Sequence, residues 1–141
     1  MRRMAKTGLT DADYAVLADF RYSLRVFLAF SESRAAEFDL TPQQHQALLA
    51  IRAAPDGKAT IGYVAERLVL KPHSASGLVG RLEALGLLER VPGADDKRQV
   101  TLSLTEGAAG ILAELSKTHR EELRRLRPLL TDLLARIDAQ G

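Results

Sequence analysis

The sequence has no cysteine and no tryptophan, and its aromatic residues are three tyrosines and four phenylalanines. Without cysteine, the chain cannot form disulfides, thiolate metal ligands or a cysteine nucleophile. It has no run of about 18 apolar residues, so we expect no membrane span. The basic N-terminus is not followed by the apolar segment of a secretory signal. We therefore expect a folded cytoplasmic protein.

Groups suited to catalysis are also scarce. The histidines His45, His73 and His119 are scattered, and the chain has neither a glycine-rich phosphate loop nor a Ser-His-Asp spacing. This pattern predicts that the chain is not an enzyme and binds no cofactor or metal. Its 141 residues suit one core, which a subunit of this size often shares with a partner.

The charge is unevenly distributed, although the net charge is only +2. Residues 41–104 carry eight basic and six acidic side chains, whereas the flanks carry equal numbers. The basic excess therefore lies in the middle of the chain. A mixed-charge surface in water would explain it equally well.

Both ends of the chain have the apolar spacing of long amphipathic helices. Residues 11–36 repeat Leu17, Phe20, Leu24 and Phe27 at intervals of three and four. A second helix should start after Thr105 and continue through leucines with heptad-like spacing, and Pro128 predicts a boundary near Arg127. One chain has no obvious means of burying both stripes, so we expect a homodimer.

The middle segment predicts three short helices and a hairpin. Thr41, Pro42 and Gln44 form a capping-box start for a helix that ends before Pro55. The predicted elements that follow are an extended piece at 58–60, helices at 61–70 and 72–85, and strands at 87–91 and 100–104 around an eight-residue loop. Ala75, Leu78, Val79, Leu82 and Leu85 form the predicted apolar side of the helix at 72–85. The fold class is thus mainly α with a small β-hairpin.

The opposite face of the helix at 72–85 is small and polar. It carries His73, Ser76, Gly77, Gly80 and Ala84, with Ser74 and Arg81 at its flanks. A helix that enters the major groove needs little bulk and needs donors and acceptors near its N-terminus. On this helix alone, glycines that permit helix packing are an equally good explanation.

The helix before it and the hairpin after it favour DNA binding, because together they form a winged helix-turn-helix pattern. At the hairpin tip, Arg98 is the candidate for minor-groove insertion and Lys97 for phosphate contact, with Asp96 orienting the arginine. A charged hairpin tip in water is the alternative. The predicted DNA-binding residues are Lys71, His73, Ser74, Ser76, Gly77, Arg81, Asp96, Lys97 and Arg98.

The whole chain resembles the MarR family of bacterial winged-helix transcriptional regulators. The resemblance rests on L-T-P-Q-Q-H-Q-A-L-L-A-I (40–51), I-G-Y-V-A-E-R-L (61–68), K-P-H-S-A-S-G-L-V-G-R-L-E-A-L-G-L-L-E-R (71–90) and D-D-K-R-Q-V-T-L-S-L-T (95–105). It implies dimerisation helices in 1–40 and 105–141 around a DNA-binding domain at 41–104, with a wing motif at 96–98. Family members usually have a distinct loop between the last two helices, whereas here only Pro128 interrupts the run.

The resemblance also implies regulation by a small aromatic or phenolic anion. The two-fold symmetry of a dimer with one recognition helix per subunit predicts an inverted-repeat operator, and we expect a repressor that the anion releases from it. Most aromatic residues lie in the first 38 positions, near Arg21, Arg25 and His45, which are the candidate ligand-binding residues. The alternative is that these rings belong to the core and the arginines face water. A DNA-binding dimer without an effector and a winged helix that binds protein or RNA are the competing functions.

Overall fold

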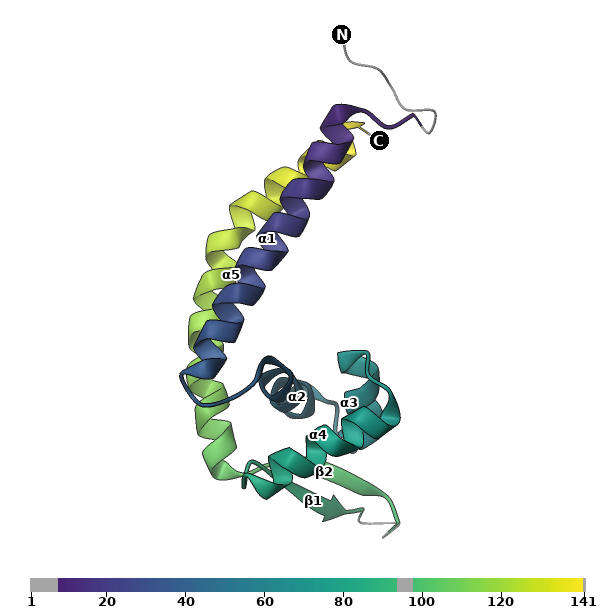
Figure 1. Cartoon of the computed structure of the whole chain (residues 1–141), viewed down its shortest axis with the longest axis vertical. Coiled ribbons are helices and arrows are strands. Elements are labelled where there is room, and N and C mark those ends of the chain that lie inside the picture. The colour runs from purple at the N-terminus through teal and green to yellow at the C-terminus, as the bar shows by residue number, and fades with distance from the viewer. Residues whose placement is uncertain (1–7, 94–97, 141) are drawn as a thin grey trace. The chain divides into compact units, whose positions relative to one another are not determined.

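The computed structural model describes residues 8–93 and 98–140. These residues form two compact units, one of residues up to 31 together with those from 117 onward, and one of residues 32–116. We call them the helical unit and the winged-helix unit. The elements in chain order are α1 (Asp11–Ala36), α2 (Pro42–Ala53), α3 (Ile61–Leu68), α4 (Pro72–Ala84), β1 (Leu88–Pro92), β2 (Val100–Leu104) and α5 (Glu106–Gln140) (Figure 1).

The start of α2 is the predicted capping box. The Gln44 backbone N–H donates to Thr41 Oγ1 at 3.1 Å, and the Thr41 N–H donates to Gln44 Oε1 at 3.0 Å. Pro42 occupies the first turn, where its missing N–H costs nothing. The sequence-based prediction of this helix is confirmed at both ends, because α2 stops at Ala53, before Pro55.

The turn between α3 and α4 comes two residues earlier than predicted. Val69 adopts a left-handed conformation, with φ of 55°, and ends α3 at Leu68 instead of Leu70. Lys71 must then be extended because Pro72 follows it, and Pro72 begins α4. At the other end of α4, Gly86 has φ of 75°, as expected of a glycine that ends a helix.

The hairpin is antiparallel, and its register pairs Leu88 with Leu104 and Pro92 with Val100. The first strand is shifted by one residue from the predicted 87–91. The extended piece at 58–60 lies beside the hairpin, because the Leu102 N–H donates to the Ala59 carbonyl at 2.7 Å. The two strands are thereby joined to the segment that leads into α3.

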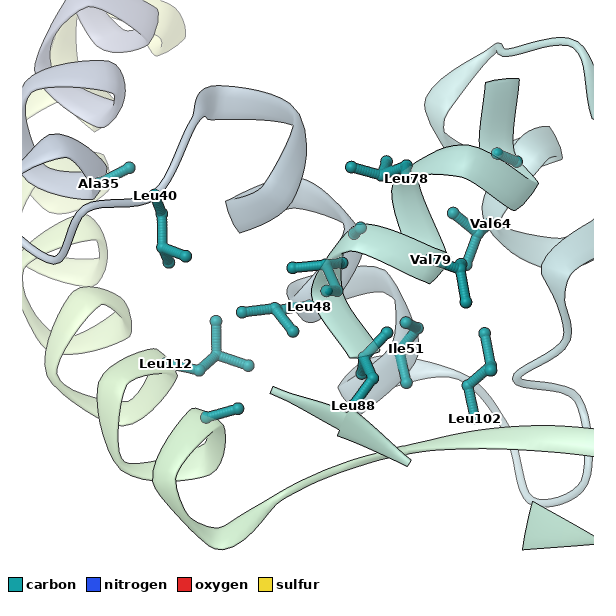
Figure 2. Close-up of a cluster of buried hydrophobic side chains, with 14 of the residues drawn as sticks. Ala35, Leu40, Leu48, Ile51, Val64, Leu78, Val79, Leu88, Leu102 and Leu112 are labelled. Atoms are coloured by element: carbon teal, nitrogen blue, oxygen red, sulfur yellow. The ribbon is translucent and has the colours of Figure 1, made fainter. Parts of the chain in front are cut away.

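One apolar core holds the winged-helix unit together (Figure 2). Every element of the unit contributes side chains to it, including Leu48 and Ile51 from α2, Val64 from α3, Leu88 from β1, Leu102 from β2 and Leu112 from α5. Four of the five predicted apolar positions of α4 are buried in it. The exception is Leu85, which lies just past the helix end and is 59% exposed, so its placement on the buried side was wrong.

In the helical unit, α1 and α5 lie side by side (Figure 1). The His119 ring stands edge-on to Phe27 and Phe30, and its Nε2 is 2.8 Å from Ser31 Oγ. Farther along, Arg136 Nη2 donates to Asp19 Oδ2 at 3.1 Å. Contacts from both ends of the pair therefore hold α5 against α1.

The predicted boundary near Arg127 is wrong, because α5 is one helix that continues through Pro128. Proline removes the hydrogen bond to the carbonyl four residues earlier, which belongs to Arg124. Both residues are exposed, so water can satisfy that carbonyl. The helix persists because hydrogen bonds and packing continue on both sides of the proline.

Much of the apolar surface of the helical unit is not covered by the chain itself. Val16, Leu126 and Leu133 are buried, but many neighbouring apolar residues are exposed. The exposed set includes Leu17, Phe20, Leu24 and Leu28 on α1, and Leu123, Leu134 and Ile137 on α5. Among the described residues, no helix combines the length and the apolar character needed to span a bilayer.

Candidate nucleic-acid interface

The predicted polar face of α4 points outward. The buried side chains Ala75, Leu78, Val79 and Leu82 fix the rotation of the helix about its axis. As a result, the five candidate residues on this helix, His73, Ser74, Ser76, Gly77 and Arg81, are all exposed. Lys71, the residue just before α4, is exposed as well. Packing against the core thus turns the small, polar and basic groups of α4 to the outside of the unit.

Four of these residues line an open groove with a volume of about 350 Å³. Its lining consists of Gln43, Leu70, His73, Ser74, Gly77 and Arg81. Lys71 and Ser76 do not line it. Gln43 comes from the first turn of α2. Sequence reasoning missed it as a candidate binding residue because the segment 41–44 was interpreted only as the start of a helix. The signal that could have found it is its exposed amide beside the capping box.

Gly77 lines the groove without a side chain, and the fold does not require a glycine there. A Cβ built on Gly77 would lie 3.6 Å from Arg81 Nη1, which is an ordinary contact with the end of a flexible side chain. A Cβ on Gly80 would meet no atom within 4 Å. Among the described residues, no other helix approaches either glycine closely, so helix packing does not explain them.

The Arg81 side chain extends back along α4 towards Gly77, which places a positive charge in the lining of the groove. Hydrogen-bond donors of His73 and Ser74 lie one turn nearer the helix start. This combination suits close approach to a nucleic acid. The cation can contact phosphates, the small donors can reach acceptors on base edges, and the glycine leaves room for the backbone.

Only part of the predicted wing can be described. Arg98 is exposed, whereas Asp96 and Lys97 lie outside the described residues. An ion pair that sequence reasoning missed joins the hairpin to α4, because Arg90 Nε donates to Glu83 Oε1 at 3.1 Å. Both side chains are about two-fifths exposed, so the pair contributes orientation more than stability. It links β1, and with it the base of the wing, to the end of α4.

The candidate ligand-binding residues fall in different units. Arg21 and Arg25 are exposed on α1 in the helical unit, whereas His45 lies in α2 of the winged-helix unit and is only 5% exposed. A second depression of about 350 Å³ lies in the winged-helix unit between the end of α2 and β2, and its polar lining includes Arg52, Asp56, Thr101 and Ser103. None of the three candidate residues lines this depression.

The family model that matches the chain is that of the MarR family, over residues 38–99. Among solved structures, AbsC, a MarR family transcriptional regulator from Streptomyces coelicolor, is 21% identical, with 93% of this chain and 90% of that chain covered and a TM-score of 0.71. A mutant of S. aureus MepR bound to an oligodeoxyribonucleotide is 20% identical, with 88% and 97% covered and a TM-score of 0.66.

Wild-type MarR from E. coli, in its apo form, is 24% identical, with 84% of this chain and 93% of that chain covered and a TM-score of 0.64. No curated protein is significantly similar to the sequence. The resemblance and the fold class inferred from the sequence are therefore confirmed.

Proposed function

We propose that this chain, which has the winged-helix fold of MarR-family regulators and matches that family over residues 38–99, is a sequence-specific DNA-binding transcriptional repressor that acts as a homodimer. The observation that carries the proposal is the groove on α4, where a polar, basic and glycine-containing face is held outward by a buried apolar face. The MepR structure with an oligodeoxyribonucleotide shows that a protein of this fold binds DNA.

In this proposal α4 enters the major groove. His73, Ser74 and Ser76 present donors and acceptors to base edges, and Gly77 allows the helix backbone to approach closely. Lys71 and Arg81 contact phosphates on either side, and Gln43 adds a contact from α2 at the groove edge. Specificity should therefore depend on the serines and His73, while the basic residues should govern affinity.

The wing adds a second contact to each half-site. We assign minor-groove insertion to Arg98, phosphate contact to Lys97 and orientation of Arg98 to Asp96. A narrow minor groove concentrates negative potential and favours A·T pairs, so the arginine should add a preference for A·T outside the major-groove contacts. The Glu83–Arg90 pair supports this role because it ties the hairpin base to α4.

The dimer follows from the uncovered apolar surface of the helical unit. Leu17 is 55% exposed and Leu134 is 62% exposed, and both lie on helices with several other exposed apolar residues. Apolar surface of this extent on a small chain indicates an interface. Two-fold symmetry would then place two copies of α4 about one DNA turn apart, roughly 34 Å, on an inverted repeat.

Repression and its release are the finer parts of the proposal. A dimer bound across a promoter blocks transcription by occupying the site, and a small aromatic anion would release it. Arg21 and Arg25, which are exposed cations, and His45 remain the residues proposed for that ligand. A thermal-shift screen of aromatic acids, repeated on Arg21→Ala and Arg25→Ala variants, tests this part separately from DNA binding.

The test of the DNA-binding function starts from a random duplex library, from which the wild-type protein selects its preferred sequence. We expect a selected sequence with dyad symmetry, bound more weakly at higher salt. Arg81→Ala should weaken binding, whereas Arg52→Ala, which removes an exposed arginine outside the groove, should not. Failure to enrich any sequence, with binding unaffected by salt, would favour a winged helix that contacts protein instead.

A further inference from the structure

Within residues 8–93 and 98–140, three helices end in the same hydrogen-bonded motif, each with one left-handed residue. After α1, the Leu40 N–H donates to the Ala35 carbonyl at 3.1 Å and the Asp39 N–H donates to the Ala36 carbonyl at 3.0 Å. The other two pairs of bonds are Leu70 to Ala65 with Val69 to Glu66, and Leu87 to Leu82 with Gly86 to Glu83. This is the Schellman motif, in which the left-handed residue is usually glycine.

The left-handed residues of the three motifs differ in how well they suit that conformation. Gly86, with φ of 75°, has no Cβ to clash, and Asp39, with φ of 59°, is of a type that visits this region with local hydrogen bonding. Val69, with φ of 55°, is β-branched, for which the conformation is a genuine outlier. The end of α3 is therefore strained, while the ends of α1 and α4 are not.

Packing of the Val69 side chain does not offset this strain. The Val69 side chain is 91% exposed, so its methyl groups gain almost nothing from the core. The neighbouring Leu70 is the apolar residue that turns inward in this motif, as Leu40 and Leu87 do in the other two. Glycine at position 69 would keep both hydrogen bonds and relieve the strain.

The place of Val69 suggests what its side chain meets. It precedes Leu70, which lines the groove with His73, Ser74, Gly77 and Arg81. A residue at this turn stands at the rim of the surface that approaches DNA, where the apolar groups of a duplex are thymine methyls and deoxyribose carbons. On the basis of the proposed DNA-binding function, we infer that Val69 makes an apolar contact with the duplex at the edge of each half-site.

The experiment measures stability and DNA affinity on the same variants, with the duplex selected by the wild-type protein. Val69→Gly should raise the midpoint of thermal unfolding by about 2–4 °C, because it removes the strain at the cost of a more flexible unfolded chain. Its affinity should fall about 16-fold, since one buried methyl contributes about fourfold and the dimer loses that contact in each of its two subunits.

Three further variants separate the contact from the strain. Val69→Ala should lose affinity without the full gain in stability, and Val69→Ile should retain affinity because it keeps the γ-carbons. Leu85→Ala removes an exposed apolar side chain at the far end of α4 and should leave affinity unchanged. Gly86→Val introduces the same strain into the same motif and should lower the unfolding midpoint.

Duplexes with uracil in place of thymine distinguish the two apolar sources. If Val69 contacts a thymine methyl, uracil weakens the wild type but not Val69→Gly; if it contacts deoxyribose, uracil affects both alike. Wild-type affinity in both Val69→Gly and Val69→Ala would overturn the inference while leaving the proposed function intact. A wild-type protein that selects no duplex would instead refute the proposed function.

Discussion

Replacing Gly77 with alanine separates what the fold needs from what DNA needs. The new methyl group would lie 3.6 Å from Arg81 Nη1, an ordinary van der Waals contact, so it strains nothing in the free protein. A glycine within a helix makes the folded state less stable than an alanine would, by about 0.5–1 kcal/mol. Gly77→Ala should therefore raise the free energy of unfolding by up to about 1 kcal/mol, and the unfolding midpoint by about 3 °C.

The same methyl group should weaken DNA binding. It would enter the groove that Ser74, Gly77 and Arg81 line, and would hold the α4 backbone away from the base edges. A displaced or lost base contact costs about 1–3 kcal/mol, and a dimer loses it twice, so the dissociation constant should rise at least about 30-fold. Stability and affinity would thus change in opposite directions.

Gly80→Ala is the matched control, since it is in the same helix and a Cβ there meets no atom within 4 Å. It should give a similar gain in stability, but because Gly80 does not line the groove, it should change affinity by less than about twofold. The two measurements are thermal unfolding and a fluorescence anisotropy titration with the selected duplex at one fixed salt concentration. Wild-type affinity in Gly77→Ala, or an equal loss in both variants, would refute the assignment of the groove as the contact surface.

Three further predictions concern the assembly on DNA. If a dimer neutralises about six phosphates, a plot of log K against log salt should have a slope near −5. Arg81→Ala should make that slope shallower by about 2, whereas Arg52→Ala should not change it; a slope near zero would contradict the phosphate contacts. Light scattering at micromolar concentration should report a dimer, and Leu17→Glu combined with Leu24→Glu should give a helical monomer with weaker DNA binding; a persistent dimer would place the interface elsewhere. Arg98→Ala should weaken binding and remove a preference for A·T at the flanks of each half-site, and an unchanged footprint and affinity would exclude this role for the wing.

The helix starts could be predicted from the sequence because each depends on neighbouring residues. Thr41 and Gln44 satisfy each other's backbone donors, and Thr60 Oγ1 accepts from the Tyr63 N–H at 3.1 Å, so the signals lie within three positions. The end of α3 could not be predicted this way. A valine gives no sign that it will adopt a left-handed conformation, and the motif depends on Leu70 turning into the core.

Residues that meet only in three dimensions were beyond sequence reasoning. Gln43 and Arg81 are far apart in the chain, and only the packing of α2 against α4 brings both to one groove. Glu83 and Arg90 pair across the turn between α4 and β1 and link the hairpin to the helix. A count of charged residues does not show which of them pair. Pro128 did not mark the predicted helix boundary, because a long helix packed along α1 tolerates the loss of one backbone hydrogen bond.

Two departures from local preference lie in or next to the groove, and their positions bear on function. Gly77 lowers helix stability in the middle of α4, and Val69 strains the turn that leads into it, yet the free chain gains no contact from either. At Thr41, Thr60 and Gly86 in the same unit, by contrast, the local signals agree with the fold. Sequences usually depart from local consistency where function requires it. A bare helix face next to an exposed apolar side chain fits a duplex, which offers close-set acceptors in its groove and apolar groups at its rim. Measuring the unfolding stability and the DNA affinity of variants at Gly77 and Val69 is therefore the sharpest test of whether this surface contacts DNA.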